Sequence, residues 1–175
     1  PRFKQTIMDN LIDVKDDGSF RMDMSYFNYC QGMTMTSPKF DLLFEGPPRR
    51  AEAPITEREM DIAASIQMVT EEIMLRCARH VHATTGMTRL CLAGGVALNC
   101  VGNGKILRNG PFEDIWIQPA AGDAGGALGV ALFISHQLLD TPRQPHGHDL
   151  QSGSLLGPRH TSDDIRAFLD SVGAT

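Results

Sequence analysis

A long amphipathic helix is the clearest pattern in the chain. Its apolar residues recur at spacings of four and three, at Ile62, Ile66, Val69, Ile73 and Cys77. This spacing places them on one face of a helix. Thr56 and Glu59 form a capping-box pattern at its start, and Gly86 stands where a helix commonly ends. The pattern predicts a helix from Thr56 to the stop at Gly86.

Two short apolar runs follow this helix and predict buried strands over residues 89–93 and 114–118. Residues 96–109 between them favour a second helix. The order strand, helix, strand predicts adjacent parallel strands with a right-handed crossover. Asp123 opens a third predicted helix, which is small and apolar as far as Ile134.

The segments on either side of this region carry weaker patterns. Residues 1–55 predict an irregular, peripheral region, with one short strand after the turn at Asp17-Gly18. Residues 27–44 are rich in Met and aromatic side chains, for which core packing is the common explanation and a ligand pocket the alternative. The chain thus divides into this region, an α/β core over 56–139, a polar linker over 140–157, and the start of a following unit over 158–175.

Composition narrows the class of protein. Hydrophobic residues make up 42% of the 175 residues, charged residues 21%, and the formal net charge is −5. These values fit a soluble globular protein and argue against a broad nucleic-acid-binding surface. No apolar run is long enough to span a membrane, and no signal peptide is visible, so we expect a cytoplasmic protein. Because the chain begins with Pro1 and not with Met, we expect it to be a piece of a longer protein.

Gly94 and Gly95 directly follow the first predicted strand and are the first candidate for chemistry. Glycines at this point let the backbone come close to a ligand, and the next helix aims its N–H groups and dipole at the same place. Asn99 on the first turn of that helix offers an amide to a ribose or a base. The alternative is a plain strand-to-helix turn.

Asp123 lies in the second candidate segment, between Gly122 and Gly125-Gly126. An Asp at a helix N-terminus is often only a cap. Here its small neighbours leave the carboxylate uncrowded, so that phosphate or a metal has room. One carboxylate is an incomplete site for a hard cation. Both candidate segments follow the carboxyl ends of neighbouring parallel strands, the edge at which open α/β sheets bind ligands.

These two segments carry a resemblance to a known family. Residues 92–100 read LAGGVALNC and residues 118–129 read QPAAGDAGGALG. Together with residues 17–21 and 61–67, they resemble the O-carbamoyltransferase family, which includes nodulation protein U and antibiotic-tailoring enzymes. The resemblance runs from near the start of the chain to about Leu139.

The resemblance implies a fold and an activity. It implies an α/β fold, the second lobe of an actin-like ATPase (RNase H-like) domain related to tRNA threonylcarbamoyl-transfer enzymes, followed by a YrdC-like domain. The family makes carbamoyl-adenylate from carbamoyl phosphate and ATP, and passes the carbamoyl group to a hydroxyl of a sugar or other small molecule. Neither nucleic acid nor a membrane is an expected partner, and self-association is left open.

The resemblance also implies site residues. It places Asp123 as a ligand of a divalent metal, iron or magnesium. It assigns contacts with the ATP or carbamoyl-adenylate nucleotide to Gly94, Gly95, Val96, Asn99, Gly125 and Gly126. The family's other metal ligands are two histidines four apart, a spacing that this sequence lacks, so we expect the remaining ligands outside the chain.

No general base is assigned, and the chain alone is expected to be inactive. The alternatives are a sugar-kinase-like phosphotransferase of the same fold and a non-catalytic nucleotide-binding or assembly module.

Overall fold

A computed structural model describes residues 1–174, so the last position of the predicted unit over 158–175 lies outside the described residues. The chain forms two compact units, one over residues 1–118 and one from Pro119 onward, and each is described by itself. The fold is a mixture of helices and small sheets. None of the helices between residues 1 and 174 combines the length and the apolar character that crossing a membrane requires.

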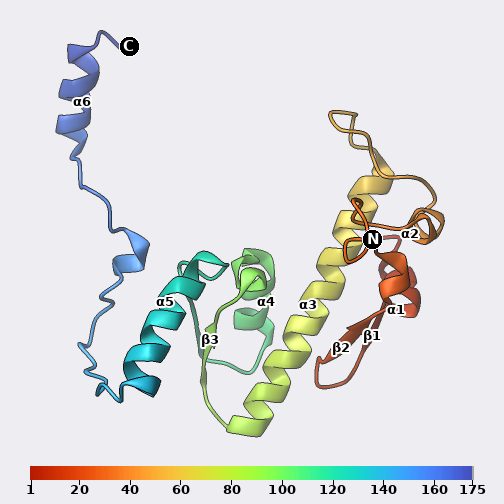
Figure 1. The fold of residues 1–175 in the computed structure, drawn as a ribbon, viewed down its shortest axis with the longest axis horizontal. Coiled ribbons are helices and arrows are strands. Elements are labelled where there is room, and N and C mark those ends of the chain that lie inside the picture. Colours follow the sequence, from red (N-terminus) through yellow and green to blue (C-terminus); the bar gives the residue numbers. More distant parts are fainter. Residues whose placement is uncertain (175) are drawn as a thin grey trace. The chain divides into compact units, whose positions relative to one another are not determined.

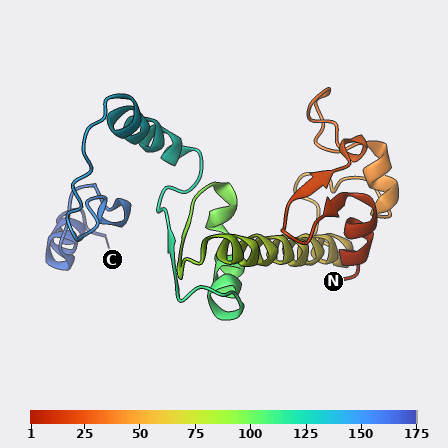
Figure 2. The ribbon, with the colours of Figure 1, turned by 90° about the horizontal axis from the view of Figure 1, so that it is seen from below.

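Helix α3, Glu57–Thr85, organises the first unit (Figure 1). It begins as predicted, because the backbone N–H of Thr56 donates to the carboxylate of Glu59 at 2.9 Å. It ends at Gly86, whose φ of 66° is the left-handed conformation that glycine adopts freely. Helix α1, Lys4–Asn10, and the hairpin of β1, Ile12–Val14, and β2, Phe20–Met22, lie on one side of α3, and α4, Cys100–Asn109, lies on the other (Figure 1). Figure 2 shows the same elements from below.

The predicted strand–helix–strand arrangement is confirmed. Strands β3, Arg89–Leu92, and β4, Asp114–Ile117, pair in parallel, and helix α4, Cys100–Asn109, connects them. Helix α4 packs closely on α3, since a Cβ added at Gly102 would lie 2.5 Å from the sulfur of Met74. A small buried cluster holds these elements together, and its fully enclosed members are Ala78, Ile106 and Phe112.

The second helix begins later than predicted. Residues Gly95–Leu98 form a 3-10 turn, η2, and the α-helix starts at Cys100 instead of Val96. Asn99 is therefore the N-cap of α4 and does not lie on its first turn. The side chain of Asn103 stabilises this arrangement, because its Nδ2 donates to the carbonyl of Ala97 at 2.7 Å.

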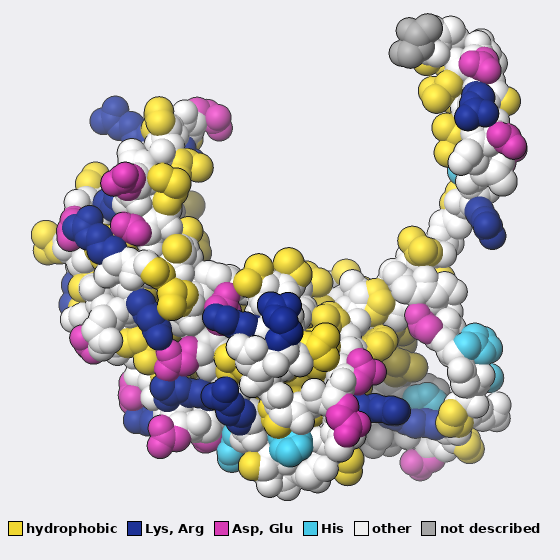
Figure 3. All heavy atoms as spheres, turned by 180° about the vertical axis from the view of Figure 1, so that it is seen from behind, with side chains coloured by type: hydrophobic (Ala, Val, Ile, Leu, Met, Phe, Trp, Pro, Cys, Tyr) yellow, Lys and Arg dark blue, Asp and Glu magenta, His cyan; other side chains and the backbone are white. Residues whose placement is uncertain are grey.

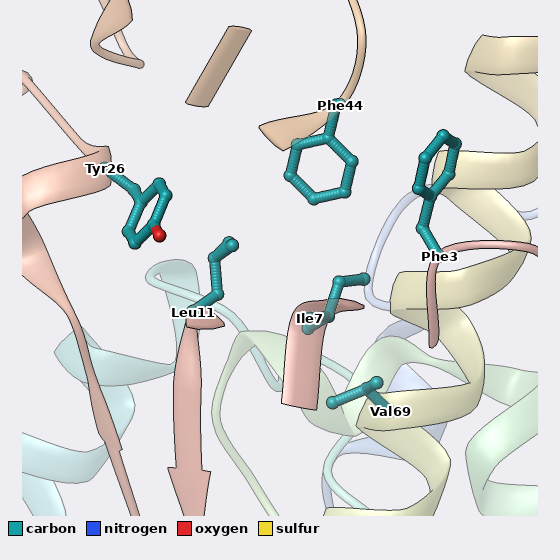
Figure 4. Packing of buried hydrophobic residues seen from close by; sticks show 6 residues of the cluster. All are labelled: Phe3, Ile7, Leu11, Tyr26, Phe44 and Val69. Carbon is teal, nitrogen blue, oxygen red and sulfur yellow. The ribbon is translucent and has the colours of Figure 1, made fainter. Parts of the chain in front are cut away.

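The first 55 residues hold more regular structure than the pattern predicts. They form helix α1, Lys4–Asn10, the antiparallel strands β1, Ile12–Val14, and β2, Phe20–Met22, the 3-10 turn η1, Met24–Tyr26, and helix α2, Pro38–Leu43. They also supply most of a buried core, drawn in Figure 4, whose members are Phe3, Ile7, Leu11, Tyr26, Phe44 and Val69.

Tertiary contacts explain this core. Phe3, Ile7 and Leu11 are four apart, so α1 turns one apolar face inward, where Val69 of α3 is also buried. The ring of Phe44 meets that of Phe3 edge-on, with centroids 5.3 Å apart, and lies 4.4 Å from that of Phe40. For these two aromatic residues of the 27–44 segment, core packing is the correct explanation.

The second unit contains helix α5, Ala124–Phe133, which continues into one π-helical turn, η3, Ile134–Leu138. After a 3-10 turn, η4, Ser152–Ser154, it ends in helix α6, Ser162–Ser171. As the sequence predicts, α6 has one apolar side. That side is exposed and contains Ile165, Phe168, Leu169 and Val172 (Figure 3, upper right).

Candidate functional site

The backbone bend after β3 is open to its surroundings. Gly94 has φ 94° and ψ 161°, a conformation that only glycine adopts without strain. A Cβ built at Gly94 or at Gly95 would meet no heavy atom within 4 Å, and both residues are exposed. The two glycines therefore leave free space at the end of β3, into which a ligand can approach the backbone closely.

A side-chain network ties the next residue of interest, Asn99, to α3. Its Nδ2 donates to Oε1 of Gln67 at 3.0 Å, and Nε2 of Gln67 donates back to Oδ1 of Asn99 at 3.1 Å. The backbone N–H of Gly102 donates to the same Oδ1 at 3.0 Å. Asn99 is half-buried, so its amide is held in place at the edge of the open bend.

Glu71 extends this network along α3. Its Oε1 accepts from Nε2 of Gln67 at 2.9 Å, and its Oε2 accepts from the ammonium of Lys105 on α4. These hydrogen bonds, chiefly the one from Lys105, hold the pKa of the Glu71 carboxyl below its ordinary value of 4.5. A buried carboxylate with such partners stays ionised at neutral pH.

Sequence reasoning did not single out Gln67, Glu71 or Lys105 as site residues. The spacing of Gln67 and Glu71 places them on one side of α3, which is a weak signal. Lys105 lies 34 residues from Glu71, and Gln67 lies 32 from Asn99. Such separations carry no pattern that a single sequence displays.

Val96 belongs to a different environment from Asn99. It lines an apolar hollow of about 300 Å³ between α3 and β3. The side chains around this hollow include Ile73, Cys77, Val81, Leu90 and Leu92. Small-molecule sites combine an apolar wall with a few polar groups that fix the orientation of the ligand. Apart from the Cys77 thiol, this lining offers no polar side chain, so Val96 borders an apolar surface and not the polar network of Asn99.

Asp123, Gly125 and Gly126 lie in the second unit, at the start of α5. The carboxylate of Asp123 is exposed and makes no cap hydrogen bond with the helix that it precedes. Gly125 has a structural reason to be glycine, because a Cβ there would lie 2.1 Å from the carbonyl oxygen of Ala120. A Cβ at Gly126 would meet nothing within 4 Å.

A metal ion does not find a complete site among the described residues. Within residues 1–174, no three His, Cys, Asp or Glu side chains come together as ligands would. Asp123 supplies one hard oxygen donor, whereas Mg²⁺ and Fe²⁺ need several ligands. At the start of α5, the described part of the chain therefore supplies one ligand, Asp123, and not a complete metal site.

The family of the chain follows from comparison with known proteins. Residues 2–132, which include both glycine segments, match the model of a family described as "Carbamoyltransferase N-terminus". The chain belongs to this carbamoyltransferase family. The match covers α3, the parallel strands and the bend with Asn99, and it reaches Asp123 in the second unit.

Several known proteins are similar in sequence to this chain. The protein sll1178 of Synechocystis, described as uncharacterized, is 56% identical over 169 residues, which are 97% of this chain and 28% of that protein. Nodulation protein NolO of Bradyrhizobium diazoefficiens is 54% identical over 115 residues, 66% of this chain and 21% of its own length. Nodulation protein U of Azorhizobium caulinodans is 37% identical over 76 residues, 42% of this chain and 14% of its own. The chain thus spans less than a third of the length of these relatives.

Proposed function

We propose that this chain is the nucleotide-binding part of an enzyme that transfers a carbamoyl group to a hydroxyl of a sugar or another small molecule. The donor would be carbamoyl-adenylate, made from carbamoyl phosphate and ATP. The fold would be the second lobe of an actin-like domain, with a YrdC-like unit beginning near residue 158. The protein would work in the cytoplasm.

The observation that carries this proposal is the open bend at Gly94-Gly95 beside the fixed amide of Asn99. The bend lets a nucleotide approach the backbone, and α4, which begins after the 3-10 turn η2, has at its N-terminus N–H groups and a dipole that favour a phosphate. Membership of the carbamoyltransferase family supports a carbamoyl group, rather than a phosphoryl group, as the unit that moves.

The transfer step is a substitution at the carbamoyl carbon. The hydroxyl oxygen of the second substrate forms a bond to that carbon, and the bond between the carbon and the adenylate oxygen breaks. AMP leaves with the bonding electrons, and the hydroxyl proton passes to a base or to solvent. The role of this chain would be to hold the AMP moiety in position, which lowers the barrier by orientation.

Asp123 would be one ligand of a divalent metal, iron or magnesium, with its other ligands outside residues 1–175. The chain alone would therefore have no turnover. The Asp123 carboxylate is exposed and makes no cap hydrogen bond, which supports its assignment as a metal ligand. A carboxylate that served only as a cap would be bonded to the helix.

Isotope labelling tests the proposed reaction. The full-length protein is given ATP, carbamoyl phosphate and a panel of sugars, with the label on the carbamoyl carbon in one series and on the γ-phosphate of ATP in the other. The proposal predicts a product that carries the carbamoyl label and AMP as the second product. A product that carries the γ-phosphate would instead identify a phosphotransferase.

A further inference from the structure

The carboxylate of Glu71 lies at one end of a chain of hydrogen bonds that ends at Asn99. Glu71 is 5% exposed, Lys105 neutralises it from α4, and Gln67 stands between it and Asn99. The side-chain hydrogen bonds that connect Glu71 to Asn99, beside the open bend, therefore run through the Gln67 amide.

The charge of Glu71 decides which way the Gln67 amide faces. An ionised carboxylate only accepts hydrogen bonds, so Gln67 must turn its Nε2 toward it. The same Nε2 then meets Oδ1 of Asn99, and Oε1 of Gln67 meets Nδ2 of Asn99.

The other end of the network imposes the same orientation independently. The backbone N–H of Gly102 only donates, and it lies 3.0 Å from Oδ1 of Asn99. Asn99 therefore has to present its oxygen to Gly102 and, from that position, its Nδ2 to Gln67. The Glu71 carboxylate, which only accepts, and the Gly102 N–H, which only donates, are thus both satisfied by one orientation of the Gln67 and Asn99 amides.

This arrangement leaves Asn99 with one free function. Its Oδ1 already accepts from Gln67 and from Gly102, so both oxygen lone pairs are used. One hydrogen of Nδ2 is bonded to Gln67, and the second has no partner among residues 1–174. A ligand atom that meets the Asn99 amide thus meets a donor, and must itself be a hydrogen-bond acceptor.

We infer that Glu71 is a positioning residue, which acts through Gln67 to hold the Asn99 amide in place as a donor-only contact for a hydroxyl oxygen, carbonyl oxygen or ring nitrogen of the bound nucleotide. The identity of the ligand as a nucleotide rests on the proposed function. The orientation of the Asn99 amide does not, because it follows from residues of the unliganded chain.

The variant Glu71→Gln tests this inference with almost no change in shape. Lys105 takes the oxygen of the new amide, so the NH₂ group of that amide faces the NH₂ group of Gln67. Gln67 can avoid this clash only by turning its amide over. Its NH₂ group would then face the NH₂ group of Asn99, which Gly102 holds in its present orientation. The double variant E71Q/K105E also replaces the donor at position 105 by an acceptor. The carboxylate at position 105 then accepts from the NH₂ group of the new amide. The oxygen of that amide accepts from Gln67, as the Glu71 carboxylate does in the wild type.

Two measurements on the full-length protein separate the inference from the proposed function. The first is NMR of the Asn99 side-chain amide without ligand, in which the wild type should show one Nδ2 hydrogen protected from exchange and one exchanging freely. E71Q should lose this difference and E71Q/K105E should regain it. An Asn99 amide that is the same in all three proteins overturns the positioning role.

The second measurement is the Kd for AMP, used as the probe. We expect E71Q to bind AMP about tenfold more weakly and E71Q/K105E to recover most of the affinity. Glu72→Gln is the matched control, since Glu72 is the next residue of α3 but pairs with Lys4 at 2.8 Å, and its AMP affinity should equal that of the wild type. A wild type that does not bind AMP, while the NMR behaves as expected, contradicts the nucleotide proposal and leaves the positioning role established.

Discussion

Gln67 and Asn99 exchange two side-chain hydrogen bonds across 32 positions of sequence, at 3.0 and 3.1 Å. This pair connects the middle of α3 to the cap of α4. It fixes the start of α4, so that the open bend at Gly94-Gly95 is followed by a residue that side-chain hydrogen bonds hold in place. A loop of this kind can admit a ligand without losing its position, which is what a preorganised binding site requires.

The conformation of Gly94 predicts that the two adjacent glycines respond differently to alanine. Gly94→Ala should lower the free energy of unfolding by about 1–3 kcal/mol, because φ 94° with ψ 161° strains any residue that has a Cβ. Gly95→Ala should change it by less than about 0.5 kcal/mol, since a Cβ there meets nothing within 4 Å. Urea unfolding followed by the fluorescence of Trp116, the single tryptophan, measures both. Equal losses in the two variants would contradict this account of the bend.

A buried hydrogen bond between Ser65 and Phe3 should contribute measurably to the stability of the first unit. Its hydroxyl is fully buried and accepts the backbone N–H of Phe3 at 3.0 Å. Ser65→Ala should destabilise the chain by about 1–3 kcal/mol, because the buried N–H of Phe3 loses its partner.

Urea unfolding also checks this prediction, with Thr84→Ala on the exposed end of α3 as the control. Within the described residues, the exposed Thr84 hydroxyl donates to the carbonyl of His80 in its own helix, so Thr84→Ala should change stability by less than about 0.5 kcal/mol. A Ser65→Ala protein as stable as the control would show that the contact with Phe3 contributes nothing.

Glu59 predicts how the stability of α3 depends on pH. Hydrogen bonds, first from the Thr56 hydroxyl and then from the Thr56 backbone N–H, lower the pKa of Glu59 from 4.5 to about 2. A carboxyl whose pKa is lowered on folding stabilises the folded state above its unfolded pKa. Its contribution is thus complete above about pH 4.5 and is lost as the pH falls through about 2.

Glu59→Gln should remove this part of the pH dependence. Thermal unfolding between pH 2 and pH 6, monitored by helical circular dichroism, should give a flatter curve for Glu59→Gln than for the wild type. Glu57→Gln, in the same first turn, is the control and should keep the slope of the wild type. A slope that Glu59→Gln leaves unchanged would assign the acid sensitivity to other carboxylates.

We expect Asp123→Asn to abolish metal binding without disturbing the fold. Because its side chain is exposed and makes no cap hydrogen bond, Asp123→Asn should change the unfolding free energy by less than about 0.5 kcal/mol. In the full-length protein the same change should remove the divalent metal that we propose, measured by elemental analysis, together with the proposed carbamoyl transfer. Asp163→Asn in α6 is a matched acidic control. Metal retained at the wild-type level by Asp123→Asn would reject Asp123 as a ligand.

The parts of the fold that local chemistry determines could be predicted from the sequence. Helix α3 has a capping box at Thr56, a regular apolar face and a left-handed glycine at Gly86, and all three can be read from the segment itself. Strands β3 and β4 are short apolar runs on either side of a helix, which fixes their parallel pairing. Each of these signals lies within one contiguous stretch of the chain.

The remaining features depend on distant contacts. Helix α1 has only seven residues and is stabilised by Val69 and Ser65 on α3, so its own propensity does not reveal it. The start of α4 moves to Cys100 because the 3-10 turn at Gly95–Leu98 comes first. At the candidate site, the sequence indicated Gly94, Gly95 and Asn99 through their position after a strand. The network beneath Asn99 was not predictable, because its members meet only when α3 and α4 pack together.

We propose that the bend at Gly94-Gly95 holds the nucleotide of a carbamoyl-transfer enzyme. A Cβ at Gly95 would meet no heavy atom of the protein within 4 Å and would enter the space that we assign to the ligand. Titration with AMP of the full-length wild type and of Gly95→Ala should therefore show binding by the wild type and at least about tenfold weaker binding by the variant, at an unchanged unfolding midpoint. Equal affinities, or no binding by the wild type, would refute a nucleotide site at this bend.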